Sequence, residues 1–144
     1  MILWRVSEFA DLEGRGGLRF KGRWHRAGSR IVYTAEHSAL ALLESLVRLE
    51  VEQEPADYQL LQIEAPNDLA VAHYPDDQPP ADRVQSREWG EQWLAALEAP
   101  LASVPSVVAP GSRNVLVNPL HPDASRIAIL RHGRYQWDPR LYLR

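Results

Sequence analysis

The stretch GRGGLRFKGRWHRAGSRIVYTAEHSALALLE, residues 14–44, decides the fold because it carries a glycine-rich loop directly into a strand and then a helix. Hydrophobic alternation over residues 30–35 predicts the strand. From Ser38 to about Glu50 the apolar residues recur at helical spacing, which predicts a helix with one apolar side. That side is expected to pack against a sheet that contains the preceding strand.

Outside this stretch, the hydrophobic pattern predicts more strands than helices. One further helix is expected from about Ser86 to a break at Pro100, with its tryptophans in the core. The polar run PDDQPPAD, residues 75–82, is expected to be an exposed connector. Further strands are expected at residues 2–6, 58–65, 69–74, 104–109, 115–117 and 126–130. Because strands and helices do not alternate regularly, we expect one α+β domain over residues 1–144, with a mixed, mainly antiparallel sheet and flanking helices.

Composition narrows the class of protein further. A chain of 144 residues with 45% hydrophobic and 24% charged residues is typical of one globular domain. The absence of cysteine from the sequence excludes disulfides and thiolate metal sites. The five histidines show no metal-ligand spacing, so no metal is expected. The sequence has neither a signal-peptide pattern nor a long apolar run, so we expect a cytoplasmic protein without a membrane anchor.

Positive charge is concentrated in the glycine-rich loop. The net charge of the chain is -3, yet no Asp or Glu occurs between residues 15 and 30. Six basic residues lie in that interval: Arg15, Arg19, Lys21, Arg23, Arg26 and Arg30. Without those six, the chain has ten basic and 19 acidic residues, a balance of -9. This asymmetry predicts an anionic ligand at the loop, and the acidic remainder argues against direct binding of nucleic acid.

Arg23 is the first candidate for binding a diphosphate, because a guanidinium can bind two phosphate oxygens at once. Stacking on the neighbouring Trp24 ring, or a surface ion pair, explains an arginine at this position equally simply. The glycines form neither a GxGxxG nor a P-loop motif, so the two common nucleotide folds have no support. Additional phosphate contacts are expected from Arg15, Arg19 and Arg26.

Glu44 and Tyr33 are the next candidates. Glu44 falls at the edge of the apolar side of its helix, where a carboxylate can project into a cleft and stabilise positive charge on a ribose during glycosidic cleavage. The alternative is a surface pair with Arg48, four residues further along the helix. Tyr33, near the end of its strand, is expected to pack against a flat ring of the ligand, or else to be a core tyrosine.

Polar residues also interrupt two apolar segments of the second half. Ser106 has no Gly-x-Ser-x-Gly context, which argues against a serine nucleophile and favours a hydroxyl that orients a ligand. Asn114 is a weaker candidate for the same task. Hydrogen bonds at a turn or a strand end explain both residues as well.

Five short motifs occur in an order that resembles the RES domain, the toxin half of bacterial RES/Xre toxin-antitoxin pairs. The motifs are LWRV at 3–6, GRW at 22–24, VYTAEHSALALLE at 32–44, VPS at 104–106 and N-x-L-x-N-P-x-H-P at 114–122. The family's arginine, glutamate and serine then correspond to Arg23, Glu44 and Ser106, and its active-site tyrosine to Tyr33. The chain departs from the family pattern at His25, where Asn is frequent, and at Arg48, where His is frequent.

The resemblance implies a fold similar to ADP-ribosyltransferases and a toxin that causes growth arrest by degrading NAD. NAD would be the substrate, and its nicotinamide-ribose bond would be cleaved by hydrolysis or phosphorolysis. A protein ADP-ribosyltransferase with the same cleft is the alternative, and a non-catalytic or RNA-directed module is a further one. The implied partner is an antitoxin with an Xre-type helix-turn-helix domain. Apolar surface on the helix that carries Trp89 also suggests a homodimer.

Overall fold

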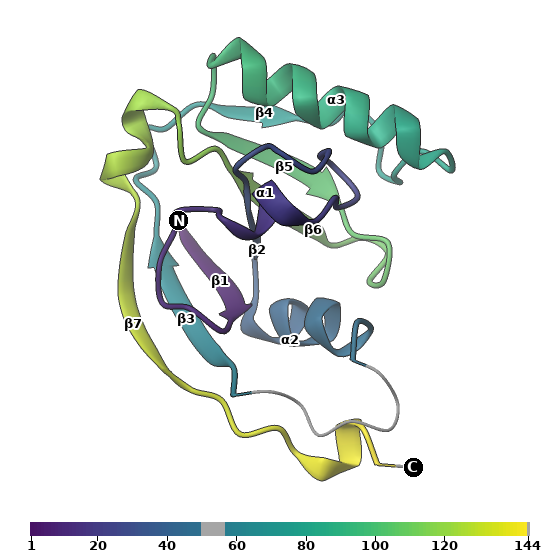
Figure 1. Ribbon diagram of the computed structural model, residues 1–144, viewed down its shortest axis with the longest axis vertical. Coiled ribbons are helices and arrows are strands. Elements are labelled where there is room, and N and C mark those ends of the chain that lie inside the picture. Colours follow the sequence, from purple (N-terminus) through teal and green to yellow (C-terminus); the bar gives the residue numbers. More distant parts are fainter. Residues whose placement is uncertain (50–56, 144) are drawn as a thin grey trace.

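The computed structural model describes residues 1–49 and 57–143, which form one seven-stranded sheet with three α-helices (Figure 1). The strand order is β4-β5-β6-β2-β1-β3-β7. The strands are β1 (Ile2–Ser7), β2 (Val32–Ala35), β3 (Gln59–Glu64), β4 (Val71–His73), β5 (Leu101–Pro105), β6 (Arg113–Val117) and β7 (Ala128–Arg134). The pair β4 and β5 is parallel and the other neighbours are antiparallel. The α+β class with a mixed, mainly antiparallel sheet is therefore confirmed.

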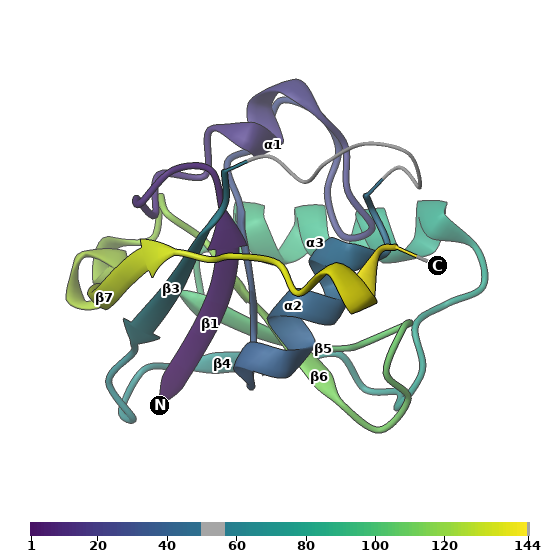
Figure 2. The same cartoon turned by 90° about the horizontal axis from the view of Figure 1, so that it is seen from below.

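The helices lie close to the strands that precede or follow them. Helix α2 (Ser38–Leu46) follows β2 directly and packs on β1 and β2, whereas α3 (Arg83–Ala96) lies beside β4 and β5 (Figures 1 and 2). The glycine-rich loop contains one short helix, α1 (Gly16–Arg19). Two 3-10 helices, η1 (Pro122–Arg126) and η2 (Pro139–Leu141), precede and follow β7.

Alternation along the strands builds the core on both faces of the sheet. In β6, Val115 and Val117 join the larger hydrophobic cluster, while Leu116 joins a second cluster with Trp24 and Trp93. The first cluster contains Leu3, Val32, Leu61, Ile63, Ala65, Leu69, Leu101, Val115, Val117 and Ile127. Each face therefore buries its own set of side chains, as period-two alternation requires.

The two halves of the sheet meet through a short contact between β1 and β2. Their register includes one residue pair, Trp4 with Ala35. Close to this point, Nη1 of Arg5 donates to the carbonyl oxygen of Tyr33 at 2.9 Å. A side-chain donor thus satisfies a backbone acceptor where the sheet opens, and it brings a cation from β1 to β2.

Several element boundaries differ from the predictions. The strand expected at 104–109 is wrong, because β5 begins at Leu101 and ends at Pro105. All five residues of β5 are buried, so no alternation marks it, and the backbone N–H of Ser106 already donates to Ser112 across a turn. The last strand begins at Ala128 rather than at residue 126, because residues 122–126 form η1.

The two longer helices also differ from expectation at their ends. Helix α3 begins three residues before Ser86, because the Asp82 side chain accepts from the backbone N–H of Val84 and caps the helix. It ends at Ala96, and the following residue, Leu97, has a left-handed φ of 53°. Helix α2 ends at Leu46, and the expected end near residue 50 lies outside the described residues.

Candidate functional site

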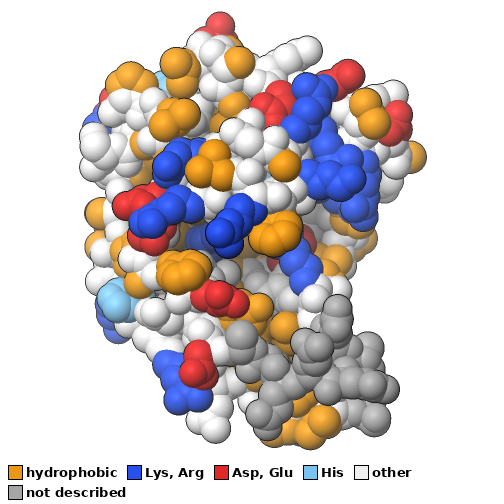
Figure 3. Space-filling model, in the orientation of Figure 1, with side chains coloured by type: hydrophobic (Ala, Val, Ile, Leu, Met, Phe, Trp, Pro, Cys, Tyr) orange, Lys and Arg blue, Asp and Glu red, His pale blue; other side chains and the backbone are white. Residues whose placement is uncertain are grey.

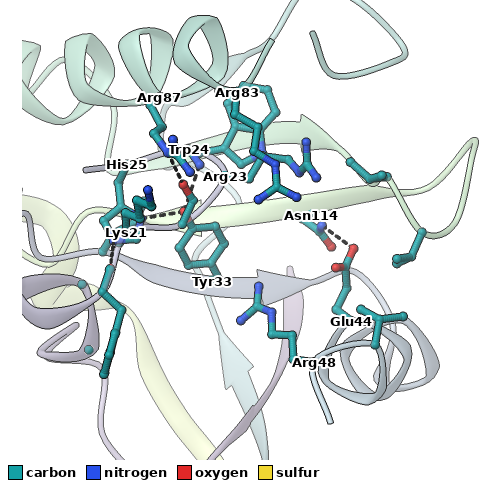
Figure 4. A pocket seen from close by; sticks show the side chains of 18 of the residues that line it. Lys21, Arg23, Trp24, His25, Tyr33, Glu44, Arg48, Arg83, Arg87 and Asn114 are labelled. Carbon is teal, nitrogen blue, oxygen red and sulfur yellow. Dashed lines mark hydrogen bonds between the residues drawn. The ribbon is translucent and has the colours of Figure 1, made fainter. Parts of the chain in front are cut away.

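A cavity of about 750 Å³ lies between the glycine-rich loop, α2, α3 and the centre of the sheet (Figure 4). Six basic side chains line it: Arg5, Lys21, Arg23, Arg48, Arg83 and Arg87. Among the described residues of the lining, Glu44 is the one carboxylate. Lys and Arg side chains also gather on the face drawn in Figure 3. The cavity therefore suits an anion that must approach one negative side chain.

Glu44 is held in place by two donors from distant segments. The hydroxyl of Ser106 donates to its Oε1 at 2.7 Å, and Nδ2 of Asn114 donates to the same oxygen at 2.8 Å. Ser106 is buried at the end of β5, and Asn114 lies on β6 opposite Ala35. These bonds fix the carboxylate at the cavity wall, and no ion pair joins it to Arg48 in the described structure.

Tyr33 points its ring into the cavity while its hydroxyl is engaged behind it (Figure 4). The hydroxyl accepts from the backbone N–H of Trp24 at 3.1 Å and lies 2.7 Å from Nδ1 of His25. Burial raises the pKa of Tyr33 to about 12, so the phenol stays neutral. A Cβ on Gly22 would lie 2.5 Å from this hydroxyl, which explains the glycine.

Arg23 is placed by the docking of its loop on α3. The Ser86 hydroxyl donates to the carbonyl oxygen of Arg23 at 2.7 Å, and Nε of Arg87 donates to that of Gly22 at 2.8 Å. The buried ring of Trp24 packs edge-on against Tyr74 and Trp89. These contacts hold the Trp24 ring in the core, and both Trp24 and Arg23 line the cavity.

Positive side chains outnumber negative ones around Arg23. Burial is the main cause that lowers the pKa of Arg23, and the neighbouring Arg83 lowers it further, while Glu44 opposes both. Burial likewise lowers the pKa of Arg5 to about 10. Cations in such an environment gain from an anionic ligand, which replaces lost solvation and offsets their mutual repulsion.

The structure brings together most of the residues proposed from sequence. Arg23, Tyr33, Glu44 and Asn114 line the cavity, and Ser106 lies behind Glu44. Outside the lining lie three arginines from which phosphate contacts were expected: Arg15, Arg19 and Arg26. Of these, Arg15 is exposed and forms ion pairs with Glu13 and Asp11 on its own loop.

Several basic residues that line the cavity were not predicted from the sequence as site residues. Arg83 and Arg87 are four residues apart, a spacing that places both on one side of a helix. The predicted helix start at Ser86 hid that signal, because Arg83 fell outside it. Arg5 stands between apolar residues in its strand. Only the pairing of β1 with β2 shows that its side chain points toward Tyr33. Arg48 was predicted to pair with Glu44 and was noted as a departure from the family pattern, but not as part of the site.

Two classes of feature are missing from the part of the chain that the structure describes. Within residues 1–49 and 57–143, no helix combines the length and apolarity needed to cross a bilayer. Within the same ranges, no three His, Asp or Glu side chains group as metal ligands would. The expectation that no metal takes part stays a prediction.

From the contact between His25 and Tyr33 we predict that the free energy of unfolding depends on pH. Nε2 of His25 lies 2.8 Å from the carbonyl oxygen of Phe20, so we assign its proton to Nε2 and let Nδ1 accept from Tyr33. Burial lowers the pKa of His25 below its usual 6.5, so the folded state binds fewer protons than the unfolded state as the pH falls below that value. The free energy of unfolding is therefore expected to decrease as the pH falls through this window.

The variant His25→Asn tests this, because it removes the titrating ring. Urea unfolding is measured from about pH 7.5 to about pH 5.5. The parent is expected to lose more stability over this range than the variant. An equal loss in both proteins would assign the pH dependence to other groups.

Comparison with known proteins identifies the family. The profile of the RES domain matches residues 2–138. A protein of Pseudomonas putida named Toxin Res is 44% identical over 133 residues, which cover 90% of this chain and 92% of that protein. A protein of Sphingobium sp. named Prs ADP-ribosylating toxin is 38% identical over 146 residues, covering 95% of this chain and 90% of that protein.

A solved structure shares the fold. In the crystal structure of the M. tuberculosis MbcT-MbcA toxin-antitoxin complex, one chain superposes with a TM-score of 0.77 at 18% identity, covering 98% of this chain and 86% of that one. At this identity the likeness concerns the fold alone. The matched profile, by contrast, covers nearly the whole chain and includes every residue placed at the cavity above. The chain therefore belongs to the RES domain family.

Proposed function

We propose that this protein is the toxin of a toxin-antitoxin pair and that it cleaves the nicotinamide-ribose bond of NAD. The observation that carries the proposal is the position of Glu44, which Ser106 and Asn114 hold at the wall of a cavity lined by six basic side chains. Among the described lining residues, Glu44 is the one carboxylate. Two relatives that span most of the chain are named as toxins, which supports the toxin role.

The diphosphate of NAD fits the cationic part of the cavity. Arg23 lies with Arg83 and Arg87 near the amino-terminal part of α3, and Lys21 lies on the adjoining loop (Figure 4). Guanidinium groups bind phosphate oxygens in pairs, and several cations together neutralise two phosphates. The lowered pKa of Arg23 supports this role, since an anion would restore the stability of its charged form.

The reacting bond would then lie beside Glu44. As the C1′–N bond breaks, its electron pair goes to the pyridinium nitrogen and nicotinamide leaves as a neutral molecule. Positive charge develops on the ribose, and the Glu44 carboxylate stabilises it electrostatically. The acceptor oxygen bonds to C1′ and its proton passes to solvent. The Tyr33 ring, fixed through its hydroxyl, packs against the nicotinamide or its ribose.

The acceptor distinguishes two forms of this reaction. Water or inorganic phosphate would degrade NAD, while a nucleophilic side chain would receive ADP-ribose. The name of the Sphingobium relative, an ADP-ribosylating toxin, favours the second form. Both forms use the same cleft, and they differ in the acceptor to which the ADP-ribose is transferred.

Product analysis separates these possibilities. The purified protein is incubated with NAD labelled in its adenine, with and without phosphate, and with and without a cell extract. We expect released nicotinamide together with a labelled small molecule, either ADP-ribose or its 1-phosphate. Label on a protein would favour transfer instead. Intact NAD under all conditions would contradict the proposed reaction and favour a non-catalytic or RNA-directed module.

An antitoxin partner is part of the proposal. The structural relative was crystallised as a toxin-antitoxin complex, and the family resemblance implies an antitoxin of the Xre type. The homodimer stays a prediction, which light scattering of the purified protein tests. Trp89 itself is partly buried and packs against Trp24 and Tyr74, as expected for the tryptophans of this helix.

A further inference from the structure

A side pocket of about 240 Å³ adjoins the main cavity. Lys21, Arg26, Ala27, Val84 and Arg87 line it. Since Lys21 and Arg87 line the main cavity as well, the two spaces share a wall. Arg26 lies outside the main cavity, but it lines the side pocket next to it.

The side pocket is strongly cationic. Of the five described residues that line it, three are basic and none is acidic. The carboxylate of Glu91 accepts from the backbone N–H of Arg26 at 2.6 Å and from the Ser29 hydroxyl at 2.9 Å. In the described structure it forms no ion pair with the side chain of Arg26. The three cations are therefore available to an anion.

The position of the side pocket relates it to one end of the substrate. In Figure 4, Lys21 and Arg87 lie across the cavity from Glu44, with Arg23 between them. With the reacting ribose at Glu44 and the diphosphate near Arg23, the adenosine half of a dinucleotide extends toward Lys21 and Arg87. Ala27 and Val84 add an apolar surface there against which a ribose or base packs.

We propose that the side pocket binds a third phosphate group, the 2′-phosphate of the adenosine ribose, and that NADP is a substrate. This inference rests on the proposed function, since it assumes that the scissile bond lies at Glu44. The diphosphate of NAD carries two phosphates. Beyond the main cavity, Arg26 adds a further cation, which forms a second cationic site together with Lys21 and Arg87 of the shared wall. A 2′-phosphate is the group by which the two dinucleotides differ.

The test compares NAD and NADP in the same assay. We measure kcat/KM for release of nicotinamide from each, and the Kd of each by calorimetry. The parent is expected to use NADP at least as well as NAD. In Arg26→Ala, the ratio of kcat/KM for NADP to that for NAD is expected to fall about 10- to 100-fold, the usual effect of losing one charge-assisted hydrogen bond.

A second variant adds a charge instead of removing one. Val84 is 53% exposed in the first turn of α3, where a carboxylate is compatible with the helix, so Val84→Asp is expected to fold normally. It should lower the same ratio by repelling the 2′-phosphate. The matched control is Arg131→Ala, which removes one exposed cation from β7 and is expected to keep the parental ratio.

The outcomes separate this inference from the proposed function. If NAD is cleaved but NADP is rejected, or if both pocket variants keep the parental ratio, the side pocket does not bind the 2′-phosphate. If neither dinucleotide is cleaved, the proposed reaction fails and calorimetry decides the binding. Tighter binding of NADP than of NAD that is lost in Arg26→Ala would still support the pocket, and equal binding would overturn it.

Discussion

Replacing Glu44 by glutamine is expected to lower the rate of NAD cleavage about 10²- to 10³-fold, the usual effect of removing one electrostatic contact to a transition state. The amide keeps an oxygen that accepts from Ser106 and Asn114, so the side chain should keep its position. What it loses is the negative charge that opposes the positive charge on the ribose. Binding of NAD should change little, because Glu44 does not contribute to binding the phosphates.

Single-turnover release of nicotinamide measures the chemical step, and calorimetry measures the binding of NAD. The matched control is Glu64→Gln, which neutralises an exposed carboxylate on β3 and is expected to keep the parental rate. A Glu44→Gln protein that consumed NAD at the parental rate would remove Glu44 from the mechanism. A protein that lost binding as well as turnover would instead indicate a disturbed cavity.

Gly90→Ala is expected to reduce the free energy of unfolding by about 1–3 kcal/mol, the usual range for overpacking. A Cβ at this position would lie 1.7 Å from the carbonyl oxygen of Trp24, and a backbone atom cannot turn aside as a flexible side chain can. Alanine within a helix is otherwise more favourable than glycine by about 1 kcal/mol. A net loss of stability therefore measures the contact between α3 and the loop.

This contact also shapes the cavity. If α3 moves away from the loop, Arg83 and Arg87 move with it, so affinity for NAD should fall together with stability. Urea unfolding and calorimetry give the two quantities. Gly133→Ala is the control, because nothing lies within 4 Å of the added methyl group there. A Gly90→Ala protein as stable as its parent would show that α3 and the loop tolerate separation.

Much of the fold follows from local patterns. The strand at residues 30–35 and the helix that begins at Ser38 were predicted because period-two and helical hydrophobic patterns are both strong there. The boundaries of β5 were predicted wrongly, because a strand buried on both faces has no alternation. Helix α1 was missed for a different reason: two of its four residues are glycines, which have poor helix propensity.

The candidate site could be predicted in part. Residues in the short motifs, among them Arg23, Tyr33 and Glu44, are recognisable because each motif is contiguous. Arg83 lies outside all five motifs, so nothing local relates it to the cavity. Arg5 lies within the LWRV motif, but nothing in that motif shows that its side chain faces Glu44. Arg15 and Arg19 show the reverse case, in which a basic residue next to a motif lies outside the cavity lining.

The sequence alone is enough to assign the family, the succession of strand and helix around Tyr33 and Glu44, and the excess of positive charge in the loop. Which charges face Glu44, and what holds its carboxylate, depend on tertiary packing. Ser106 and Asn114 reach it from 62 and 70 positions away in the chain. Local patterns report which side of an element is apolar, whereas the convergence of side chains depends on how distant elements pack.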